Sequence, residues 1–268
     1  MISPDRLHSG QNAVFSPPSS KRSRDATERV RPRLSTELAV RGIRFGNPVF
    51  IRILKEEGLL ELFVRESRKR TFKLFKTYPI AAMSGDLGPK EREGDLQAPE
   101  GFYYVPPRQM NPHSRFHLSF NLGYPNAYDR HHDRTGSHLM IHGNRVSIGC
   151  FAMTDPGIEE IYSLCHAALA EGQPFFRVHC FPFRMTTQRL ARERSNKWSP
   201  FWNNLREGYD YFERIKTPPG CSCRQWQIHL QVTTQLVSGM NVGIVIPLGG
   251  VTAPLAWATC NSQFLAPH

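Results

Sequence analysis

The sequence lacks the features that mark several classes of protein. Before residue 225, no run without charged side chains is long enough to cross a bilayer, which excludes a polytopic membrane protein. The six cysteines include no CxxC pair, so neither a zinc ribbon nor a thioredoxin-like site is indicated. The first residues contain no apolar run after a basic start, so no secretory signal peptide is visible, which taken literally indicates the cytoplasm.

Charged residues are also absent from one long segment. Residues 225–268 contain no Asp, Glu, Lys or Arg, and their apolar part is interrupted by glycine and proline, which makes a poor membrane span. No structure is predicted for residues 219–268. The remainder is ordinary for a folded protein: 40% of the 268 residues are hydrophobic and 11% are aromatic, which excludes wholesale disorder.

The charge of the chain is strongly positive. Lys and Arg number 34 against 23 Asp and Glu, a formal net charge of +11. Almost half of this excess lies in residues 1–46, which we interpret as a basic flexible arm with a short helix interrupted near Pro32. Such an arm could contact a polyanion, but no aromatic side chains interleave the basic ones, so a solvated linker is favoured and nucleic acid is not expected as a partner.

The pattern of apolar residues predicts a β-rich α+β protein. Strands are expected at residues 49–54, 59–64, 72–80, 101–105, 116–120, 138–142, 146–150 and 175–183. A helix is expected from Thr154 or Asp155 to about Leu169, and helical structure again over 186–215 with a break near Pro200. These elements define a catalytic domain at 47–183 and a helical extension at 184–218.

Reactive side chains are densest between residues 138 and 150. An apolar strand delivers His142 to a turn at Gly143, and a second short strand ends at Gly149 and Cys150. Two adjacent strands with so short a connection can place an imidazole beside a thiol. The imidazole can then lower the pKa of that thiol and carry a proton to the leaving amine. The backbone N–H groups of Gly149 and Cys150 could hold an oxyanion. On spacing alone, a buried core cysteine and an ordinary turn histidine are the favoured interpretation.

The same residues resemble the signature of the L,D-transpeptidases, the YkuD-type domain, and the wider match is similar to its YafK-like branch. The signature is His142-Gly143 followed by Ser147-Ile148-Gly149-Cys150, and the resemblance covers about residues 20–218. Supporting segments are residues 48–53, 97–103, 116–126 and 147–155. In many members of the family a longer loop separates the His-Gly and Ser-x-Gly-Cys elements. Many also carry His at the position of Ile148 and Arg at the position of Ala152.

This resemblance implies a YkuD-like mixed β-sheet or β-sandwich domain, with one helix after the catalytic cysteine, and an activity on peptidoglycan stem peptides in the periplasm or cell envelope. Cys150 would attack the carbonyl of the third stem residue, and His142 would donate and accept the proton. The acyl-enzyme would pass to an amine in a transpeptidase, or to water in a hydrolase that trims stem peptides or releases an envelope lipoprotein. The resemblance implies neither a metal nor another cofactor.

Further residues and two other functional classes complete the predictions. Ser147, Gly149 and Gly143 are candidates for backbone support of the site, and His117, Tyr124 and Arg134 for substrate binding. A metal hydrolase would draw on His131, His132, His138 and His142, although no carboxylate stands at a ligand spacing. A non-catalytic polyanion-binding module would be indifferent to Cys150 and sensitive to salt.

Overall fold

The described part of the chain forms a mixed α+β fold with two mixed sheets, which confirms the predicted fold class. The structure is a computed structural model that describes residues 16–224 and 227–231, with side chains for residues 16–219. Most of the uncharged tail therefore lies outside the described residues, as do residues 1–15. None of the helices within the described ranges is both long and apolar enough to traverse a bilayer.

The larger sheet has five strands in the order β3-β2-β1-β9-β4. The strands are β1 (Val49–Leu54), β2 (Leu59–Arg65), β3 (Phe72–Pro79), β4 (Gly101–Val105) and β9 (Phe176–Phe181). Strand β1 pairs antiparallel with β2 and parallel with β9, and all six of its residues are buried. A central strand covered on both faces has no solvent side, which explains why β1 reads as a continuous apolar run broken only by Arg52.

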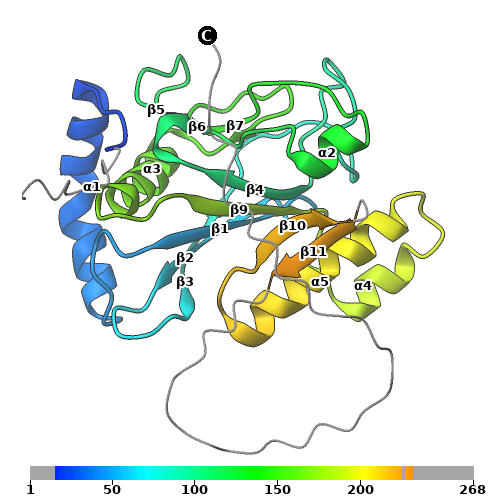
Figure 1. Ribbon diagram of the computed structural model, residues 1–268. Helices are drawn as coiled ribbons and strands as arrows, with labels where there is room; N and C mark the ends of the chain where they lie inside the picture. The colour runs from blue at the N-terminus through cyan, green and yellow to red at the C-terminus, as the bar shows by residue number, and fades with distance from the viewer. Residues whose placement is uncertain (1–15, 225–226, 232–268) are drawn as a thin grey trace, which may run out of the picture. The chain divides into compact units, whose positions relative to one another are not determined.

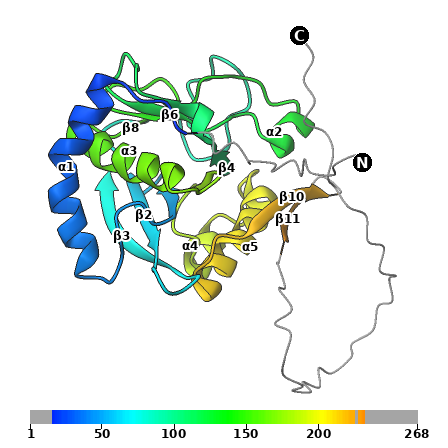
Figure 2. The same cartoon turned by 60° about the vertical axis from the view of Figure 1, so that its left-hand side comes forward.

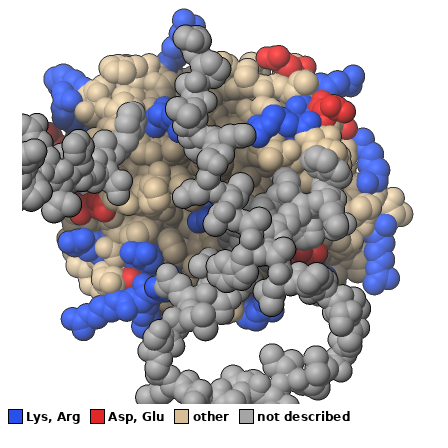
Figure 3. Space-filling model, viewed as in Figure 1, with Lys and Arg blue, Asp and Glu red and all other residues tan. Residues whose placement is uncertain are grey.

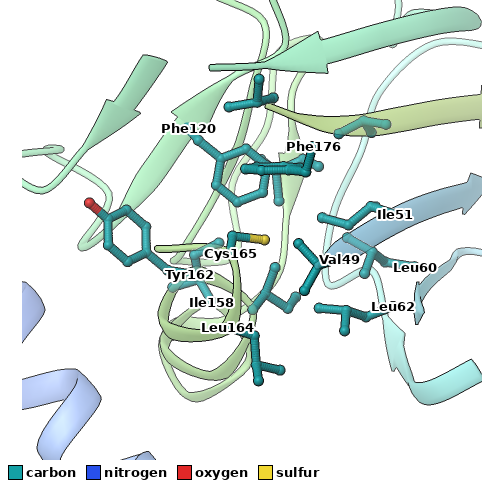
Figure 4. Close-up of a cluster of buried hydrophobic side chains, with 14 of the residues drawn as sticks. Val49, Ile51, Leu60, Leu62, Phe120, Ile158, Tyr162, Leu164, Cys165 and Phe176 are labelled. Atoms are coloured by element: carbon teal, nitrogen blue, oxygen red, sulfur yellow. The ribbon is translucent and has the colours of Figure 1, made fainter. Parts of the chain in front are cut away.

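Helices cover both faces of this sheet (Figures 1 and 2). On one side lie α3 (Asp155–Ala170) and, outside it, α1 (Lys21–Ala39); on the other lies α5 (Ser199–Ile215), next to α4 (Thr187–Arg192). Figure 4 shows the core on the α3 side, where the sulfur of Cys165 lies among Phe120, Phe176 and Val49. On the α5 side, Phe212 packs against Phe50 with ring centroids 4.7 Å apart.

The smaller sheet carries the candidate site. Its order is β5-β6-β7-β8, with β5 at Met110–Asn111, β6 at Ser119–Asn121, β7 at Met140–His142 and β8 at Phe151–Ala152. Strands β7 and β8 are parallel, although only residues 143–150 connect them. Most parallel neighbours need a longer crossover, so this short connection is tightly constrained. The remaining elements are η1 (Pro107–Gln109), α2 (Ala127–His131) and a hairpin of β10 (Gly220–Arg224) and β11 (Gln227–Gln231).

The structure corrects three local predictions. Helix α1 is continuous through Pro32, so the expected interruption is wrong. The missing N–H costs the helix stability, but Leu34 and Leu38 are fully buried in the domain core and offset that loss. Residues 146–150 form a loop rather than a strand, and the Ile148 side chain is exposed in it. Strand β8 begins only at Phe151. The strand expected at 116–120 begins instead at Ser119.

Other local predictions are confirmed. Helix α3 starts behind Thr154, whose hydroxyl accepts a hydrogen bond from the Gly157 N–H at 3.3 Å. Residues 187–215 are helical in two pieces, and Pro200 stands in the first turn of α5, where a proline has no N–H bond to lose.

The basic N-terminal segment is packed onto the domain from Ser20 onward. The hydroxyls of Thr27 and Ser163 lie 2.9 Å apart between α1 and α3, and Arg29 pairs with Glu159 on α3 at 2.5 Å. Part of the positive charge that the sequence concentrates in this segment therefore faces carboxylates of the same chain. Figure 3 shows Lys and Arg side chains around the rim of the visible face, with Asp and Glu at fewer places.

Candidate active site

The pairing of β7 with β8 sets the position of Cys150. His142 is the register partner of Ala152, and Ile141 that of Phe151, so one step back along both strands brings Cys150 beside Met140. The Met140 N–H donates to the Cys150 Sγ at 3.4 Å, which confirms this placement. Met140 and His142 are two residues apart on β7, so their side chains share a face and their Cα atoms are about 7 Å apart along the strand.

The thiol of Cys150 is partly exposed and lies in a mixed environment. Its Sγ also approaches the carbonyl oxygen of His138 at 3.6 Å. Burial raises the pKa of Cys150, while the Met140 N–H and the positive charge of Lys90 act to lower it. The lowered thiol pKa expected from the sequence is thus wrong for this structure, because desolvation outweighs the favourable contacts. The resting thiol keeps its proton at neutral pH.

His142 is held in one orientation. Its side chain is buried, and its Nδ1 donates to the carbonyl oxygen of Gly143 at 2.5 Å. A carbonyl can only accept, so this bond fixes the proton on Nδ1 and leaves Nε2 with its lone pair free to accept a proton. Burial lowers the pKa of His142, against a smaller opposing effect of the Gly143 carbonyl. The imidazole is therefore neutral at pH 7, the state that a general base requires.

An aromatic ring that the functional predictions did not include supports His142. The Phe116 ring lies 4.7 Å from the imidazole, centroid to centroid, at an interplanar angle of 34°. The segment containing Phe116 is fixed on both sides: its carbonyl accepts from the Gly143 N–H at 3.0 Å, and Arg22 of α1 donates to the His117 carbonyl at 2.8 Å. Helix α1 thus braces the loop whose Phe116 ring packs on the His142 imidazole.

The two glycines of the signature are needed for different reasons. A Cβ on Gly143 would lie 2.6 Å from a carboxylate oxygen of Asp155 and 2.8 Å from the Phe116 carbonyl, so no side chain fits. Gly149 has φ +121°, a conformation that residues with a side chain rarely adopt. A Cβ there would also lie 3.4 Å from the Gln97 carbonyl, which shows how closely the loop of residues 81–100 approaches.

Ser147 braces the turn in front of the thiol. Its hydroxyl donates to the Cys150 carbonyl at 2.7 Å and accepts from the Gly149 N–H at 3.2 Å. The Gly149 N–H therefore has an internal partner, which leaves the Cys150 N–H as the stronger candidate of the two oxyanion donors considered from the sequence.

The loop of residues 81–100 is anchored by a buried ion pair. Lys55 and Glu100 meet at 3.0 Å with side chains 2% and 0% exposed. The Lys55 ammonium also donates to the carbonyls of Asp86, Gly88 and Ala98 at 2.9 to 3.0 Å. The second carboxylate oxygen of Glu100 accepts from the Trp202 indole N–H of α5 at 2.7 Å. The helical extension is thereby linked to the loop beside Gly149.

The three predicted substrate-binding side chains all have partners within the chain. His117 Nε2 lies 2.8 Å from a carboxylate oxygen of Glu159 on α3. The Tyr124 hydroxyl donates to the Lys90 carbonyl at 3.0 Å and is buried. Arg134 is buried and pairs with Asp129 at 2.8 Å. These contacts give each side chain a structural role, and of the three His117 lies next to the signature, since a Cβ on Gly143 would fall 3.0 Å from the His117 Cβ.

A metal centre finds no support in the described residues. Within residues 16–219, no three His, Cys, Asp or Glu side chains are grouped as a metal ion would need. His131 and His132 lie at the end of α2 with ring centroids 5.2 Å apart, while His142 is engaged with Gly143. Cys221 and Cys223 fall in β10, whose side chains lie outside the described part.

Several functional groups had no sequence signal. The Met140 amide acts through its backbone, so any residue there would supply it, and Lys55 and Glu100 are ordinary charged residues until the fold buries them together. Phe116 lies inside the segment that carried the resemblance, but nothing in its pattern distinguished it from a core residue.

A thiol against β7 and an oriented, neutral imidazole two residues further along that strand, next to a glycine turn, are the groups that a cysteine acyltransferase or hydrolase requires. A model of the YkuD family, the L,D-transpeptidase catalytic domain, matches residues 49–177. The chain is 48% identical over 177 residues to the "Putative L,D-transpeptidase YafK" of Escherichia coli K12, covering 66% of this chain and 71% of that protein. The protein of the same name from Escherichia coli O157:H7 matches equally. The chain belongs to the L,D-transpeptidase family with a YkuD-type catalytic domain.

Solved structures give a more distant likeness. The helical cell shape determining protein Pgp2 from Campylobacter jejuni, as a K307A mutant, aligns with a TM-score of 0.42 and 19% identity over 72% of this chain. The chain spans 65% of the length of that protein. Another structure of Pgp2 aligns with a TM-score of 0.41 and 19% identity, over 70% of this chain and 79% of that one. At this level the likeness carries no argument about activity.

Proposed function

We propose that the protein is a cysteine-dependent L,D-transpeptidase that acts on peptidoglycan stem peptides in cell-wall biogenesis or remodelling. The observation that supports this proposal is a partly exposed Cys150 thiol against the Met140 N–H of β7, two residues before His142, whose Nδ1–H bond to Gly143 leaves Nε2 unprotonated. Membership of the family supports the substrate class and a place of action outside the cytoplasm. Peptidoglycan is therefore the proposed partner, with an envelope lipoprotein as a second one.

The first half-reaction forms an acyl-enzyme. His142 Nε2 takes the thiol proton while the Cys150 sulfur attacks the carbonyl carbon of the third stem residue, usually meso-diaminopimelate. The tetrahedral oxyanion accepts a hydrogen bond from the Cys150 N–H. The carbon–nitrogen bond to the fourth residue breaks, and the imidazolium returns the proton to the departing amine, which leaves as a D-amino acid.

The second half-reaction reverses these roles. An incoming amine or water gives its proton to His142 and attacks the thioester carbon, and the carbon–sulfur bond breaks as the thiol is restored. An amine gives transpeptidation, either a cross-link or an attached lipoprotein, and water gives hydrolysis. The raised pKa of Cys150 means that deprotonation occurs during the attack rather than before it.

Mass spectrometry of a single preparation tests this proposal. Purified protein is incubated with a disaccharide-tetrapeptide, with and without a glycine or D-amino acid acceptor, and both products and intact protein are weighed. We expect a disaccharide-tripeptidyl adduct on Cys150 and an acceptor-bearing product. A product formed by water alone would assign hydrolysis instead.

Two cysteine variants provide the matched comparison. Cys150→Ala is expected to abolish adduct and product, whereas Cys165→Ala, which removes a thiol buried in the core, is expected to retain both. Equal activity in Cys150→Ala and the unchanged protein would refute the mechanism, and loss on adding a chelator would favour a metal hydrolase.

A further inference from the structure

The backbone that follows His142 is tied to the residues that lead into α3. The His142 carbonyl accepts from the Met153 N–H at 2.8 Å, and the Asn144 carbonyl accepts from the Thr154 N–H at 3.0 Å. The Asn144 N–H donates to a carboxylate oxygen of Asp155 at 2.8 Å. Asn144 has φ +68°, a left-handed conformation in which the chain turns sharply. The turn after the imidazole is therefore fixed to the start of α3.

The Gly143–Asn144 peptide group carries hydrogen bonds at both of its ends. Its carbonyl oxygen, from Gly143, accepts from the His142 Nδ1 at 2.5 Å, and its N–H, from Asn144, donates to Asp155. The carbonyl and the N–H of a trans peptide point in opposite directions, so the imidazole and the carboxylate lie on opposite sides of one planar group. Along this path the Asp155 oxygen is at most about 7.5 Å from Nδ1.

The Asp155 side chain is not the cap of its own helix. The Thr154 hydroxyl supplies that cap by accepting from the Gly157 N–H. A carboxylate in the first turn of a helix also interacts favourably with the helix dipole, but that interaction requires no particular partner. The Asp155 carboxylate accepts from an N–H that lies 11 residues earlier in the chain. Its geometry therefore serves the turn after His142.

A carboxylate at the N–H end of a peptide group strengthens the carbonyl at the other end. Hydrogen bonds in a chain polarise one another, and an ionised acceptor forms a stronger hydrogen bond than a neutral one. The Gly143 oxygen thus carries more negative charge than it would in a peptide without this contact. That charge favours the imidazolium that His142 becomes when it takes the Cys150 proton. The Gly143 carbonyl acts in the same direction on the pKa of His142, which it raises.

Other charged and titratable side chains come from the segments packed around this turn. They are Arg22, Lys90, His117, Arg145, Cys150 and Glu159. The His117 imidazole pairs with Glu159 at 2.8 Å, and Glu159 pairs with Arg29 of α1 at 2.5 Å, so this second carboxylate is engaged away from the peptide group. Arg145 is exposed. Asp155 is the carboxylate that contacts the peptide group on which the imidazole rests.

We propose that Asp155 is a positioning residue of the catalytic site, which holds and polarises the peptide group that accepts from His142. The proposal rests on the proposed function for the reaction in which His142 takes part. Asp155 fills the role of the carboxylate in a Ser-His-Asp triad, with one peptide group inserted between the carboxylate and the imidazole. The proton stays on Nδ1, and the carboxylate takes none. Without its charge, His142 becomes a weaker base, and the substrate contacts stay in place.

Nuclear magnetic resonance of His142 tests this coupling without substrate. The full-length chain is isotope-labelled at the ε1 carbon of its histidines, and a His142→Gln variant identifies the His142 signal. Its titration midpoint is compared between the unchanged protein and Asp155→Asn, which keeps an oxygen acceptor for the Asn144 N–H but loses the charge. At low salt we expect the midpoint to fall by about half a pH unit, as for a unit charge removed about 7.5 Å away in a water-like dielectric. Higher salt should narrow the difference.

The acylation of Cys150 by a disaccharide-tetrapeptide gives a second measurement. Asp155→Asn should lower kcat about three- to tenfold, the difference between a charged and a neutral acceptor, with little change in KM. Asp155→Ala also removes the acceptor and should lower kcat further. The acidic limb of kcat/KM should move to lower pH in both variants, in step with the His142 midpoint.

Two control variants separate this role from helix stability and from general charge. Thr154→Ala removes the hydroxyl cap of α3, so it should lower the melting temperature and leave the His142 midpoint unchanged. Asp210→Asn removes an exposed carboxylate that pairs with Arg206 on α5, and should leave both the midpoint and kcat unchanged.

The outcomes distinguish the alternatives. An unchanged or raised His142 midpoint in Asp155→Asn would overturn the proposal. An equal fall in Thr154→Ala would also overturn it, because the start of α3 rather than the charge would then set the midpoint. If Asp155→Ala does not fold, the isosteric Asp155→Asn decides alone. Failure of the proposed function is seen separately, as the absence of a Cys150 adduct in the unchanged protein, and the His142 titration would still report on Asp155.

Discussion

Removing the charge of Lys55 gives the sharpest test of how the fold supports the site. In Lys55→Met, the Glu100 carboxylate would stay buried without its ion-pair partner, and three carbonyls would lose the ammonium that they share. Breaking a buried pair from one side costs about 3–5 kcal/mol. The stability of a whole domain is about 5–15 kcal/mol, so a large part of it would be lost.

Urea unfolding measures this loss directly. Lys69→Met, which removes an exposed partner of Glu66 3.6 Å away, serves as the control and should cost less than about 1 kcal/mol. Adding Glu100→Gln to Lys55→Met removes the uncompensated charge and should recover at least about 1 kcal/mol. A cost below about 1 kcal/mol for Lys55→Met, or no recovery in the double variant, would refute the assigned role of the pair.

Three further predictions concern the histidines and the ring beside the site. Because burial lowers the pKa of His142, kcat/KM should fall on the acidic side with a midpoint below pH 6.5; a pH–rate profile with a midpoint at or above 6.5 contradicts this. Phe116→Ala should lower kcat about 2- to 12-fold, from a ring contact of about 0.5–1.5 kcal/mol, with little change in melting temperature. His179 is fully buried with neither ring nitrogen hydrogen-bonded, and burial keeps its pKa well below 6.5. Below pH 6.5 the His179 imidazole gains a proton only in the unfolded chain, so the free energy of unfolding should fall as the pH drops below 6.5. His179→Phe should reduce that dependence and add about 1–3 kcal/mol; an unchanged urea midpoint between pH 7 and pH 5 in the unchanged protein would argue against it.

The signature residues were identifiable from the sequence because local chemistry requires them. Gly143 and Gly149 occupy positions where a side chain would clash or strain the backbone. Long periodic elements were equally readable: the spacing of apolar residues and the cap at Thr154 predicted α3. These features depend on residues that are close together in the chain.

Local patterns misjudged the elements that are decided by distant contacts. Pro32 would interrupt an isolated helix, but burial of α1 against the domain keeps it continuous. Arg134, predicted from its polar segment to be available for substrate binding, is buried against Asp129. The sequence of residues 146–150 alternates like a strand, but the turn needed to bring β8 beside β7 leaves Ile148 exposed.

The sequence by itself indicated the candidate nucleophile and its candidate imidazole partner through the family signature, and the α+β class through short-range periodicity. Only the tertiary structure decided the protonation states of the pair and the anchoring of the loop by Lys55 and Glu100. The physical reason is that desolvation and ion pairing depend on which distant segments fold against a side chain, and no local pattern contains that information.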